Sequence, residues 1–319
     1  MADVSKVVKL AEAVRAEVGK AVVGQTEVVD ALLVGLITGG HVLIEGVPGT
    51  AKTLIARAMA HALDVSFKRI QFSPDMMPAD VVGTNVFDAK QQEFYLRRGP
   101  IFANVVLADE INRTPPKTQA ALLEAMQEQS VTIDGVVHPL PSPFLVVATQ
   151  NPVEYEGTYP LPEAQLDRFS QKVVVTYPSA EEERAILARH AGGMEMPDLA
   201  SLGLKQVASG ADVLEARSAL DEVLVDDSVL DYVGAVVRAT REHPWVFLGA
   251  SPRAGVSVLV AAKARALMAG RTFVTPDDVK TSALTGLRHR ILLRPEVEIE
   301  GTEPDSVIAD VLESVPVPR

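Results

Sequence analysis

Two short motifs contain the residues of this sequence whose types and spacing could do chemistry. The first is a glycine-rich turn between the apolar run Val42-Leu43-Ile44 and a helical pattern that starts near Leu54. In such a turn, backbone N–H groups and the positive end of the following helix can hold a phosphate group. Lys52 would reach the outer phosphates of a nucleotide, and Thr53 would bring its hydroxyl to Mg²⁺. The residues expected to contact this nucleotide are Gly46, Pro48, Gly49, Thr50, Ala51, Lys52, Thr53 and Leu54.

One residue of the turn departs from the phosphate-loop pattern G-x-x-x-x-G-K-[ST]. Ala51 stands where the pattern has its second glycine. A methyl group is acceptable there if the residue has a negative φ, as in the first turn of a helix, so we expect that conformation for Ala51. Taken alone, the turn could also be an ordinary loop with a solvated lysine.

The second motif is the apolar run Val105-Val106-Leu107-Ala108, which ends in two adjacent carboxylates. Asp109, at the end of the expected strand, could hold Mg²⁺ through its water shell. Glu110 would point the other way and polarise a water for attack on the γ-phosphate. A strand that meets a charged loop is common, but each motif here supplies the part of a Mg-nucleotide site that the other lacks.

Composition and charge exclude several classes of protein. The 319 residues are enough for two domains, and 47% hydrophobic and 23% charged residues are typical of soluble proteins. No stretch approaches the ~18 apolar residues of a membrane span, and no signal-like block starts the chain, so we expect a cytoplasmic protein without membrane insertion. The absence of cysteine excludes disulfides, thiolate zinc sites and cysteine nucleophiles.

A formal net charge of −12 disfavours nucleic acid as a partner, because no basic stripe offsets it. The short clusters Arg97-Arg98 and Arg288-His289-Arg290 are interpreted as solvated faces. The histidines lack ligand spacing and are interpreted as structural or surface residues. They are His41, His61, His138, His190, His243 and His289.

Apolar runs and helical patterns alternate along the first half of the chain. Two helices, near 4–18 and 26–38, precede this alternation. Strands are then expected near 41–45, 66–72, 104–109, 144–149 and 172–177, with helices near 52–63 and 116–129. The alternation predicts a mostly parallel sheet covered on both faces. Both motifs fall at the carboxyl ends of strands, where ligands bind in such sheets.

Two intervals fit this alternation poorly and predict inserted hairpins. The first pairs Gly83 to Phe87 with Glu93 to Leu96. The second places the turn Asp134-Gly135 between two short apolar strands. On a rigid scaffold such insertions are natural contact elements, and inert surface hairpins are the alternative.

After Tyr177-Pro178 the pattern becomes helical. Helices are expected near 212–224, 227–240, 252–270 and 276–288, and no strong strand is expected before Val297. The prediction is an α/β nucleotide-binding domain over 1–178 and a helical domain over 179–319. A nucleotide bound at their junction would couple its state to their relative angle.

Three polar residues outside the two motifs need a reason. Asn151 ends a buried strand pattern and could bind the attacking water or the γ-phosphate, although a turn-forming Asn-Pro is equally common. Arg168 and Arg253 are either surface ion pairs or groups that stabilise charge on a neighbouring subunit's nucleotide.

Taken in order, these features resemble Walker A, Walker B, sensor 1, the arginine finger and sensor 2 of the AAA+ ATPases. They are the loop at 46–53, Asp109-Glu110, Asn151, Arg168 and Arg253. Within that superfamily the chain resembles most the MoxR group, from about residue 22 to its C-terminal helices. The specific runs are Asp109-Glu110-Ile111-Asn112-Arg113, Leu122-Leu123-Glu124-Ala125-Met126, Ala148-Thr149-Gln150-Asn151-Pro152 and LPEAQLDRF at 161–169.

The resemblance implies an AAA+ P-loop domain with a parallel sheet, helix-2 insert and pre-sensor-1 hairpins, followed by an α-helical lid. It also implies ATP and Mg²⁺ as cofactors and a hexameric ring with ATP between subunits. Arg168 would act in trans, as would Arg253, with Arg113 a further candidate. Val23 and Gly24 would lie near the adenine, and alanine at position 51 would be a family feature.

Four functions are compatible with these features to different degrees. The first is an ATP-hydrolysing chaperone that remodels or activates an unknown protein client, with a partner containing a von Willebrand factor A domain, as the resemblance implies. The second is the ATPase subunit of a metal-chelatase complex. A nucleic-acid translocase is disfavoured by the acidic balance, and a scaffold that binds ATP without turning it over is disfavoured by Glu110.

Overall fold

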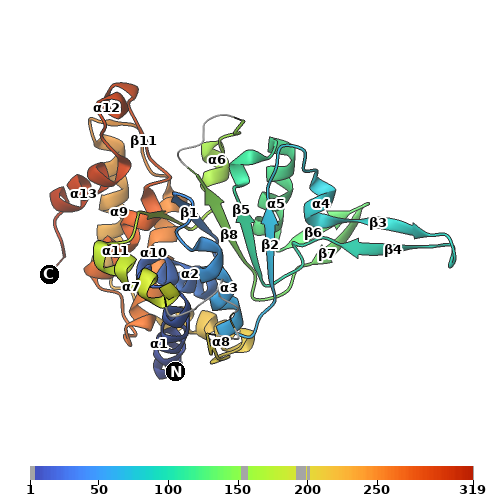
Figure 1. Cartoon of the computed structure of the whole chain (residues 1–319). Coiled ribbons are helices and arrows are strands. Elements are labelled where there is room, and N and C mark those ends of the chain that lie inside the picture. The colour runs from blue at the N-terminus through green and yellow to red at the C-terminus, as the bar shows by residue number, and fades with distance from the viewer. Residues whose placement is uncertain (1–3, 152–156, 192–198, 200–201, 319) are drawn as a thin grey trace.

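Five parallel strands form the centre of the first half of the molecule (Figure 1). The computed structural model describes residues 4–151, 157–191, 199 and 202–318. The strand order is β2-β5-β8-β1-β9, with every neighbouring pair parallel. The strands are β1 (Val42–Gly46), β2 (Phe67–Gln71), β5 (Val105–Asp109), β8 (Leu145–Gln150) and β9 (Gln171–Val175). The expected alternation and its parallel sheet are therefore confirmed.

The apolar side chains of these strands are divided between two cores. On β1, Val42 and Ile44 enter a core with the N-terminal helices, whereas Leu43 enters a second core. This follows from the period of two along a strand, which sends successive side chains to opposite faces. The central strands β1, β5 and β8 are almost continuously buried, as strands covered on both faces must be.

Helices cover both faces of the sheet. One core contains α1 (Val4–Ala21), α2 (Thr26–Thr38) and α3 (Lys52–Ala62), and the other contains α5 (Pro116–Glu128). Short helical turns complete this half, namely α4 (Pro78–Val82), η1 (Ile111–Arg113) and α6 (Glu163–Leu166).

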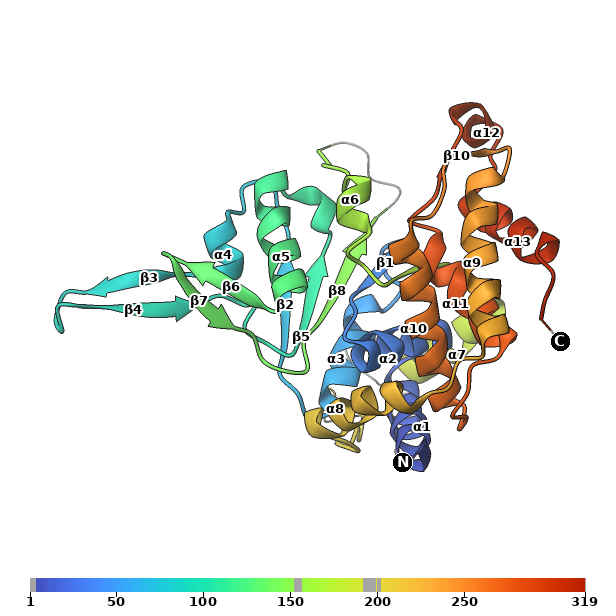
Figure 2. The same ribbon diagram turned by 180° about the vertical axis from the view of Figure 1, so that it is seen from behind.

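Both expected hairpins are present and lie beyond the β2 side of the sheet, away from the C-terminal helices (Figure 2). They are β3 (Gly83–Asp88) with β4 (Glu93–Arg98), and β6 (Ser130–Ile133) with β7 (Val136–Pro139). In the second turn Asp134 and Gly135 have φ values of 48° and 81°. Positive φ at both positions suits the twist of a two-residue hairpin. Asn85 Nδ2 donates to Asp134 Oδ2 at 2.8 Å and so links the two hairpins.

The second half is mainly helical, as expected. Its helices are α7 (Ala180–Ala191), α8 (Gly210–Ser218), η2 (Ala219–Glu222), α9 (Asp227–Glu242), α10 (Pro252–Met268), α11 (Pro276–Leu287), α12 (Pro295–Ile299) and α13 (Pro304–Ser314). The helices α1 and α2 pack against α10, so the N-terminal helices join the sheet to this half. None of the described helices is long and apolar enough to cross a membrane.

One expectation for this half was wrong in detail. Two short strands, β10 (Val246–Leu248) and β11 (Leu292–Leu293), precede Val297, which itself lies in α12. The strands have three and two residues, too few for a period to appear in the sequence. Pro295 at the first helical position and the acidic Glu296 in the first turn favour the helix.

Candidate nucleotide site

The glycine-rich turn leaves the carboxyl end of β1 and enters α3. Gly46 is the last residue of β1, where an added Cβ would lie 2.5 Å from the carbonyl oxygen of Val175, so only glycine fits. Gly49 has a φ of 85°, which also favours glycine. The Thr50 hydroxyl donates to the carbonyl oxygen of Val47 at 3.0 Å and closes the turn.

Ala51 does not have the negative φ that we expected. Its φ is 60° and its ψ 18°, in the left-handed region, at the residue immediately before the first helical residue of α3. The chain changes direction between β1 and α3, and this change occurs at Ala51, just before the first turn of the helix. A non-glycine residue there costs roughly 1–2 kcal/mol. The Ala51 side chain packs against the larger core, which offsets part of this cost.

Lys52 and Thr53 begin α3, so they lie at its positive end. Lys52 Nζ donates to the carbonyl oxygens of Gly46 and Val47, at 2.6 and 3.0 Å. Burial lowers the pKa of Lys52, and the nearby carboxylates Asp109 and Glu110 act in the opposite direction. The two motifs are thus close enough in space to interact electrostatically.

Asp109 and Glu110 are joined through Thr149, the penultimate residue of the neighbouring strand β8. The Thr149 hydroxyl donates to Asp109 Oδ1 at 2.6 Å and accepts the backbone N–H of Glu110 at 2.9 Å. Glu110 has a φ of 57°, so the chain turns sharply at the end of β5. Sequence reasoning missed Thr149, although its position beside Gln150-Asn151 at the end of a buried strand was a usable signal.

Two polar residues of β2 also reach these carboxylates. Arg69 donates to Asp109 Oδ2 from Nε at 3.0 Å and from Nη2 at 2.6 Å, and Gln71 Nε2 donates to Glu110 Oε2 at 2.8 Å. Arg113 Nε lies 3.1 Å from the same Glu110 oxygen. Arg69 and Gln71 were not predicted. Their spacing of two on a strand gave them a common face, but only the strand order shows that this face meets Asp109 and Glu110.

The remaining residues predicted for this end of the site lie on three segments. Asn151 follows β8 and is 7% exposed, and the segment that comes next lies outside the described residues. Val23 and Gly24 connect α1 to α2. An added Cβ on Gly24 would lie 2.1 Å from Glu182 Oε1, so this connection lies tightly against α7. Leu54 is in the first turn of α3 and packs against the larger core.

The oxygen atoms of Thr53 and Asp109 are of the kind that bind Mg²⁺ in nucleotide sites. The Thr53 hydroxyl and the Asp109 carboxylate supply hard oxygen ligands, and Mg²⁺ takes one or two such groups together with phosphate oxygens and water. Among the described residues, no three His, Asp or Glu side chains form a cluster that could hold a metal by themselves.

Arg168 and Arg253 lie at the other end of the sheet. They line a pocket of about 290 Å³ together with Gly40, His41 and Ser170, which directly precede β1 and β9. The phosphate loop follows the last residue of β1, and the five residues of that strand span roughly 16 Å. The structure therefore brings Arg168 and Arg253 together and separates both from the phosphate loop of their own chain.

The Asp167 carboxylate, next to Arg168 in the chain, faces both Arg253 and Arg290. Arg253 Nε lies 3.8 Å from Asp167 Oδ2, and Arg290 Nε lies 2.6 Å from Asp167 Oδ1. Arg253 stands in the first turn of α10, where the Ser251 hydroxyl accepts the backbone N–H of Ala254 at 3.3 Å. The Arg168 guanidinium donates to the Gln127 side chain.

The cluster Arg288-His289-Arg290 is buried, so its interpretation as a solvated face was wrong. The Arg290 side chain is 3% exposed and also donates to the carbonyl oxygens of Asp167, Phe169, Ser170 and Gly286. His289 Nε2 lies 2.9 Å from the Phe169 carbonyl oxygen. Carbonyl groups before β9 thus contact Arg290 and His289, whereas Arg288 pairs with the Asp305 carboxylate. The sequence gives no sign of these contacts.

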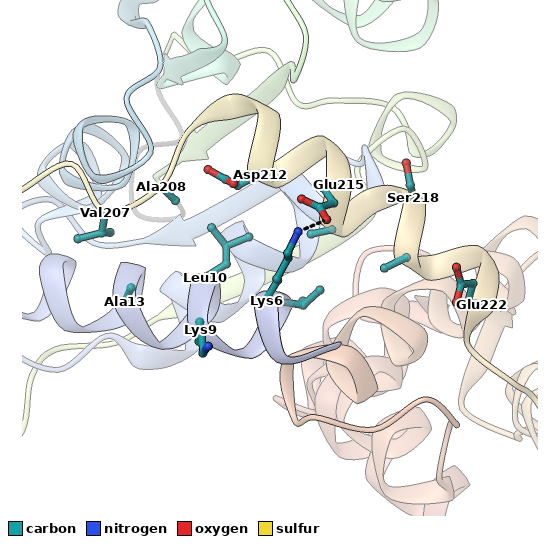
Figure 3. Close-up of a pocket in the computed structure, with 13 residues that line it drawn as sticks. Lys6, Lys9, Leu10, Ala13, Val207, Ala208, Asp212, Glu215, Ser218 and Glu222 are labelled. Atoms are coloured by element: carbon teal, nitrogen blue, oxygen red, sulfur yellow. Dashed lines mark hydrogen bonds and ion pairs between the residues drawn. The ribbon is translucent and has the colours of Figure 1, made fainter. Parts of the chain in front are cut away.

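A second hollow, of about 540 Å³, lies between α1 and α8 (Figure 3). The ion pair between Lys6 Nζ and Glu215 Oε1, at 2.7 Å, bridges the two helices. The hollow contains none of the predicted site residues and is remote from both motifs.

Comparisons with known proteins agree with this geometry. The family model described as "ATPase family associated with various cellular activities (AAA)" matches residues 41–171, and the AAA lid domain matches residues 238–311. The chain is 46% identical to the uncharacterized protein YeaC of Bacillus subtilis, over 94% of this chain and 92% of that protein. It is also 46% identical to Chaperone MoxR1 of Mycobacterium tuberculosis, over 95% of this chain and 81% of that protein.

A crystal structure of a Cytophaga hutchinsonii protein matches with a TM-score of 0.89 and 42% identity, covering 99% of this chain and 98% of that one. The similarity thus includes both the sheet and the helices that follow it. Relatives this similar over nearly the whole length, together with the AAA and AAA lid matches, show that the chain belongs to the MoxR family of AAA+ ATPases.

Proposed function

We propose that this protein binds ATP with Mg²⁺ and hydrolyses it to ADP and phosphate. The observation that carries the proposal is the convergence of Lys52, Asp109 and Glu110 at the carboxyl edge of one sheet. A lysine on a helix N-terminus suits the phosphates, and two carboxylates opposite it suit a cation and a water.

Each residue has a separate role in this proposal. The α3 N-terminus and Lys52 bind the phosphates, while Thr53 and Asp109 hold Mg²⁺, which supplies positive charge to the phosphate oxygens. Glu110 accepts a proton from the attacking water, and Asn151 orients that water. Thr149 fixes Asp109 and Glu110 relative to each other through its two hydrogen bonds.

We further propose that the protein works as a hexameric ring in which Arg168 and Arg253 act on the nucleotide of a neighbouring subunit. Their location supports this, because both line one pocket at the end of the sheet opposite to their own phosphate loop. Arginine stabilises the charge that develops in phosphoryl transfer. Arg113 contacts Glu110 of its own chain, which favours a role in cis for that residue.

The energy of hydrolysis would remodel or activate a client protein, together with a partner that contains a von Willebrand factor A domain. Membership of the MoxR family supports this proposal, as do the exposed aromatic side chains of the β3–β4 hairpin. Phe87, Phe94 and Tyr95 are 52%, 72% and 52% exposed, on a hairpin that extends from the body (Figure 2). Large apolar groups in such a position suit protein contacts.

The test separates binding from hydrolysis. We expect Glu110→Gln to bind ATP as the wild type does and to lose at least ~100-fold in hydrolysis rate, because the proton acceptor is removed. Lys52→Ala should lose ATP binding itself. Glu124→Gln, on the exposed face of α5, is the matched control and should hydrolyse ATP normally.

Fluorescent-nucleotide binding and phosphate release measure the two steps. Normal turnover by Glu110→Gln would exclude Glu110 as the base. The same variant, isolated from its native cell with ATP trapped, also tests the partner proposal. Recovery of no von Willebrand factor A protein under these conditions would count against that partner class.

A further inference from the structure

The two oxygens of the Asp109 carboxylate have different partners. Oδ1 accepts the Thr149 hydroxyl, and Oδ2 accepts two N–H groups of one guanidinium, that of Arg69. The Oδ2 contact pairs a permanent positive charge with the carboxylate assigned above to Mg²⁺. Arg69 and a cation would therefore be like charges on one small group.

We propose that Arg69 lowers the affinity of the nucleotide site for Mg²⁺ by competing with the cation for Asp109. The inference rests on the proposed MgATP function and adds a residue that sets how strongly the cation is held. Mg²⁺ must either displace Arg69 from the Asp109 carboxylate or bind beside its positive charge. Its binding is therefore weaker, and a higher Mg²⁺ concentration is needed to fill the site.

Arg69 is suited to reversible competition rather than to permanent blockage. Its side chain is 48% exposed, so the guanidinium can leave Asp109 and remain in water. An ion pair of this exposure stabilises a protein by at most about 1 kcal/mol. By contrast, Asp109 is only 13% exposed and stays fixed by Thr149, so the mobile member of the pair is the arginine.

The same arginine also connects the two carboxylates of the site. The Arg69 guanidinium donates to the Gln71 side chain, and Gln71 Nε2 donates to Glu110 Oε2 at 2.8 Å. Movement of Arg69 away from Asp109 therefore removes one hydrogen bond from Gln71 as well. The β2 strand can thus couple cation binding at Asp109 to the position of the Glu110 carboxylate.

A purely supporting role for Arg69 predicts the opposite sign. If Arg69 only held Asp109 in a productive orientation, removing it would weaken Mg²⁺ binding. If it competes, removing it strengthens Mg²⁺ binding. The direction of the change in cation affinity therefore decides between the two roles.

The chain offers a matched control on the same strand. Lys68 is exposed and carries the same charge as Arg69. Successive side chains of β2 alternate between faces, so Lys68 shares a face with Ile70, which lies in the core, and Arg69 points to the opposite face. Lys68→Gln and Arg69→Gln thus remove equal charge at adjacent positions. Only the second removes the contact with Asp109.

The experiment measures cation binding directly, without turnover. Mn²⁺, as a spectroscopic substitute for Mg²⁺, is titrated by electron paramagnetic resonance into full-length protein saturated with ADP, and fluorescent-ADP binding is followed against free Mg²⁺. We expect Arg69→Gln to bind the cation at least about fivefold more tightly than wild type, because a like charge has been removed. Lys68→Gln should stay within about twofold, and Arg69→Lys, which keeps the charge, should lie closer to wild type than Arg69→Gln.

Unchanged or weaker cation binding in Arg69→Gln would overturn the inference, as would an equal gain in Lys68→Gln. These outcomes leave the proposed function intact if wild type shows Mg²⁺-dependent nucleotide binding that Lys52→Ala lacks. A wild-type protein whose nucleotide binding ignores Mg²⁺ would overturn both proposals. The two failures are thus distinguishable in one set of titrations.

Discussion

At the scale of single residues, burial changes the chemistry of groups that look ordinary in the sequence. His41 is the clearest case, because it is only 4% exposed and its ring contacts β8 and α5. Its Nδ1 accepts the backbone N–H of Val146 at 3.0 Å, which leaves Nε2 to donate to the carbonyl oxygen of Met126 at 3.0 Å. This agrees with the interpretation of the histidines as structural or surface residues.

Burial lowers the pKa of His41 from 6.5 to about 4. The unfolded chain takes up a proton near pH 6.5, whereas the folded protein resists protonation until about pH 4. Stability from this group is therefore complete above pH 6.5 and falls as the pH drops toward 4, by about 3 kcal/mol in total. Burial lowers the pKa of His289 as well, so it acts in the same direction.

We expect the free energy of unfolding of His41→Gln to depend less steeply on pH between 6.5 and 4 than that of wild type. The slope should decrease by up to about 1.4 kcal/mol per pH unit, which corresponds to one proton. Urea unfolding at a series of pH values measures it. His138→Gln, on the β6–β7 hairpin, serves as the control, and an equal slope in wild type and His41→Gln would contradict the prediction.

At the scale of elements, the turn after α11 docks the helical half onto the segment that precedes β9. Arg290 contributes to this contact through the Asp167 carboxylate and three carbonyl oxygens, those of Asp167, Phe169 and Ser170. Removing a buried charged group leaves its acceptors unpaired, which is expensive. The same segment contains Arg168, so this docking also fixes the position of the proposed arginine finger.

Arg290→Met should lower the free energy of unfolding by about 3 kcal/mol, because Asp167 and the carbonyl groups lose a buried partner. Arg253→Met is the comparison, since Arg253 also faces Asp167 but its side chain is 60% exposed. That variant should change stability by at most about 1 kcal/mol. Denaturant unfolding followed by circular dichroism measures both, and similar losses in the two variants would show that burial does not decide the effect.

At the scale of the whole molecule, the two groups of residues proposed to act on one nucleotide lie at opposite ends of the sheet. The phosphate loop with Asp109 and Glu110 lies at the carboxyl edge of the sheet, and the pocket with Arg168 and Arg253 lies at the opposite end. If both groups act on one nucleotide, as proposed, a subunit completes its site only with further copies of itself. This arrangement suits a closed ring of identical subunits.

Mixed rings test this division directly. Arg168→Ala should bind ATP but hydrolyse it slowly, and Lys52→Ala should not bind ATP at all. When the two inactive variants are mixed, Lys52→Ala subunits still present Arg168 to neighbours with an intact phosphate loop, so part of the activity should return. Phosphate release from mixtures at several ratios measures this. Activity that never exceeds the sum of the separate variants would rule out action in trans.

The sequence by itself determined the fold class and the place of most elements. The alternation of strands and helices, the Asp134-Gly135 turn and the helix near 252–270 were all predicted from local patterns. These features depend on period and turn chemistry, which short segments carry on their own. The roles of the predicted site residues remain predictions that the experiments above address.

Only the tertiary structure decided which distant residues meet. Thr149, Arg69 and Gln71 reach Asp109 and Glu110 because β2, β5 and β8 are neighbours in the sheet, and strand order is not visible in any one segment. The left-handed φ of Ala51 likewise follows from the space between β1 and α3. The burial of residues 288–290 depends on a contact made about 120 residues away in the chain. Local sequence fixes periods and turns, whereas pairing across the sheet depends on the packing of the whole chain.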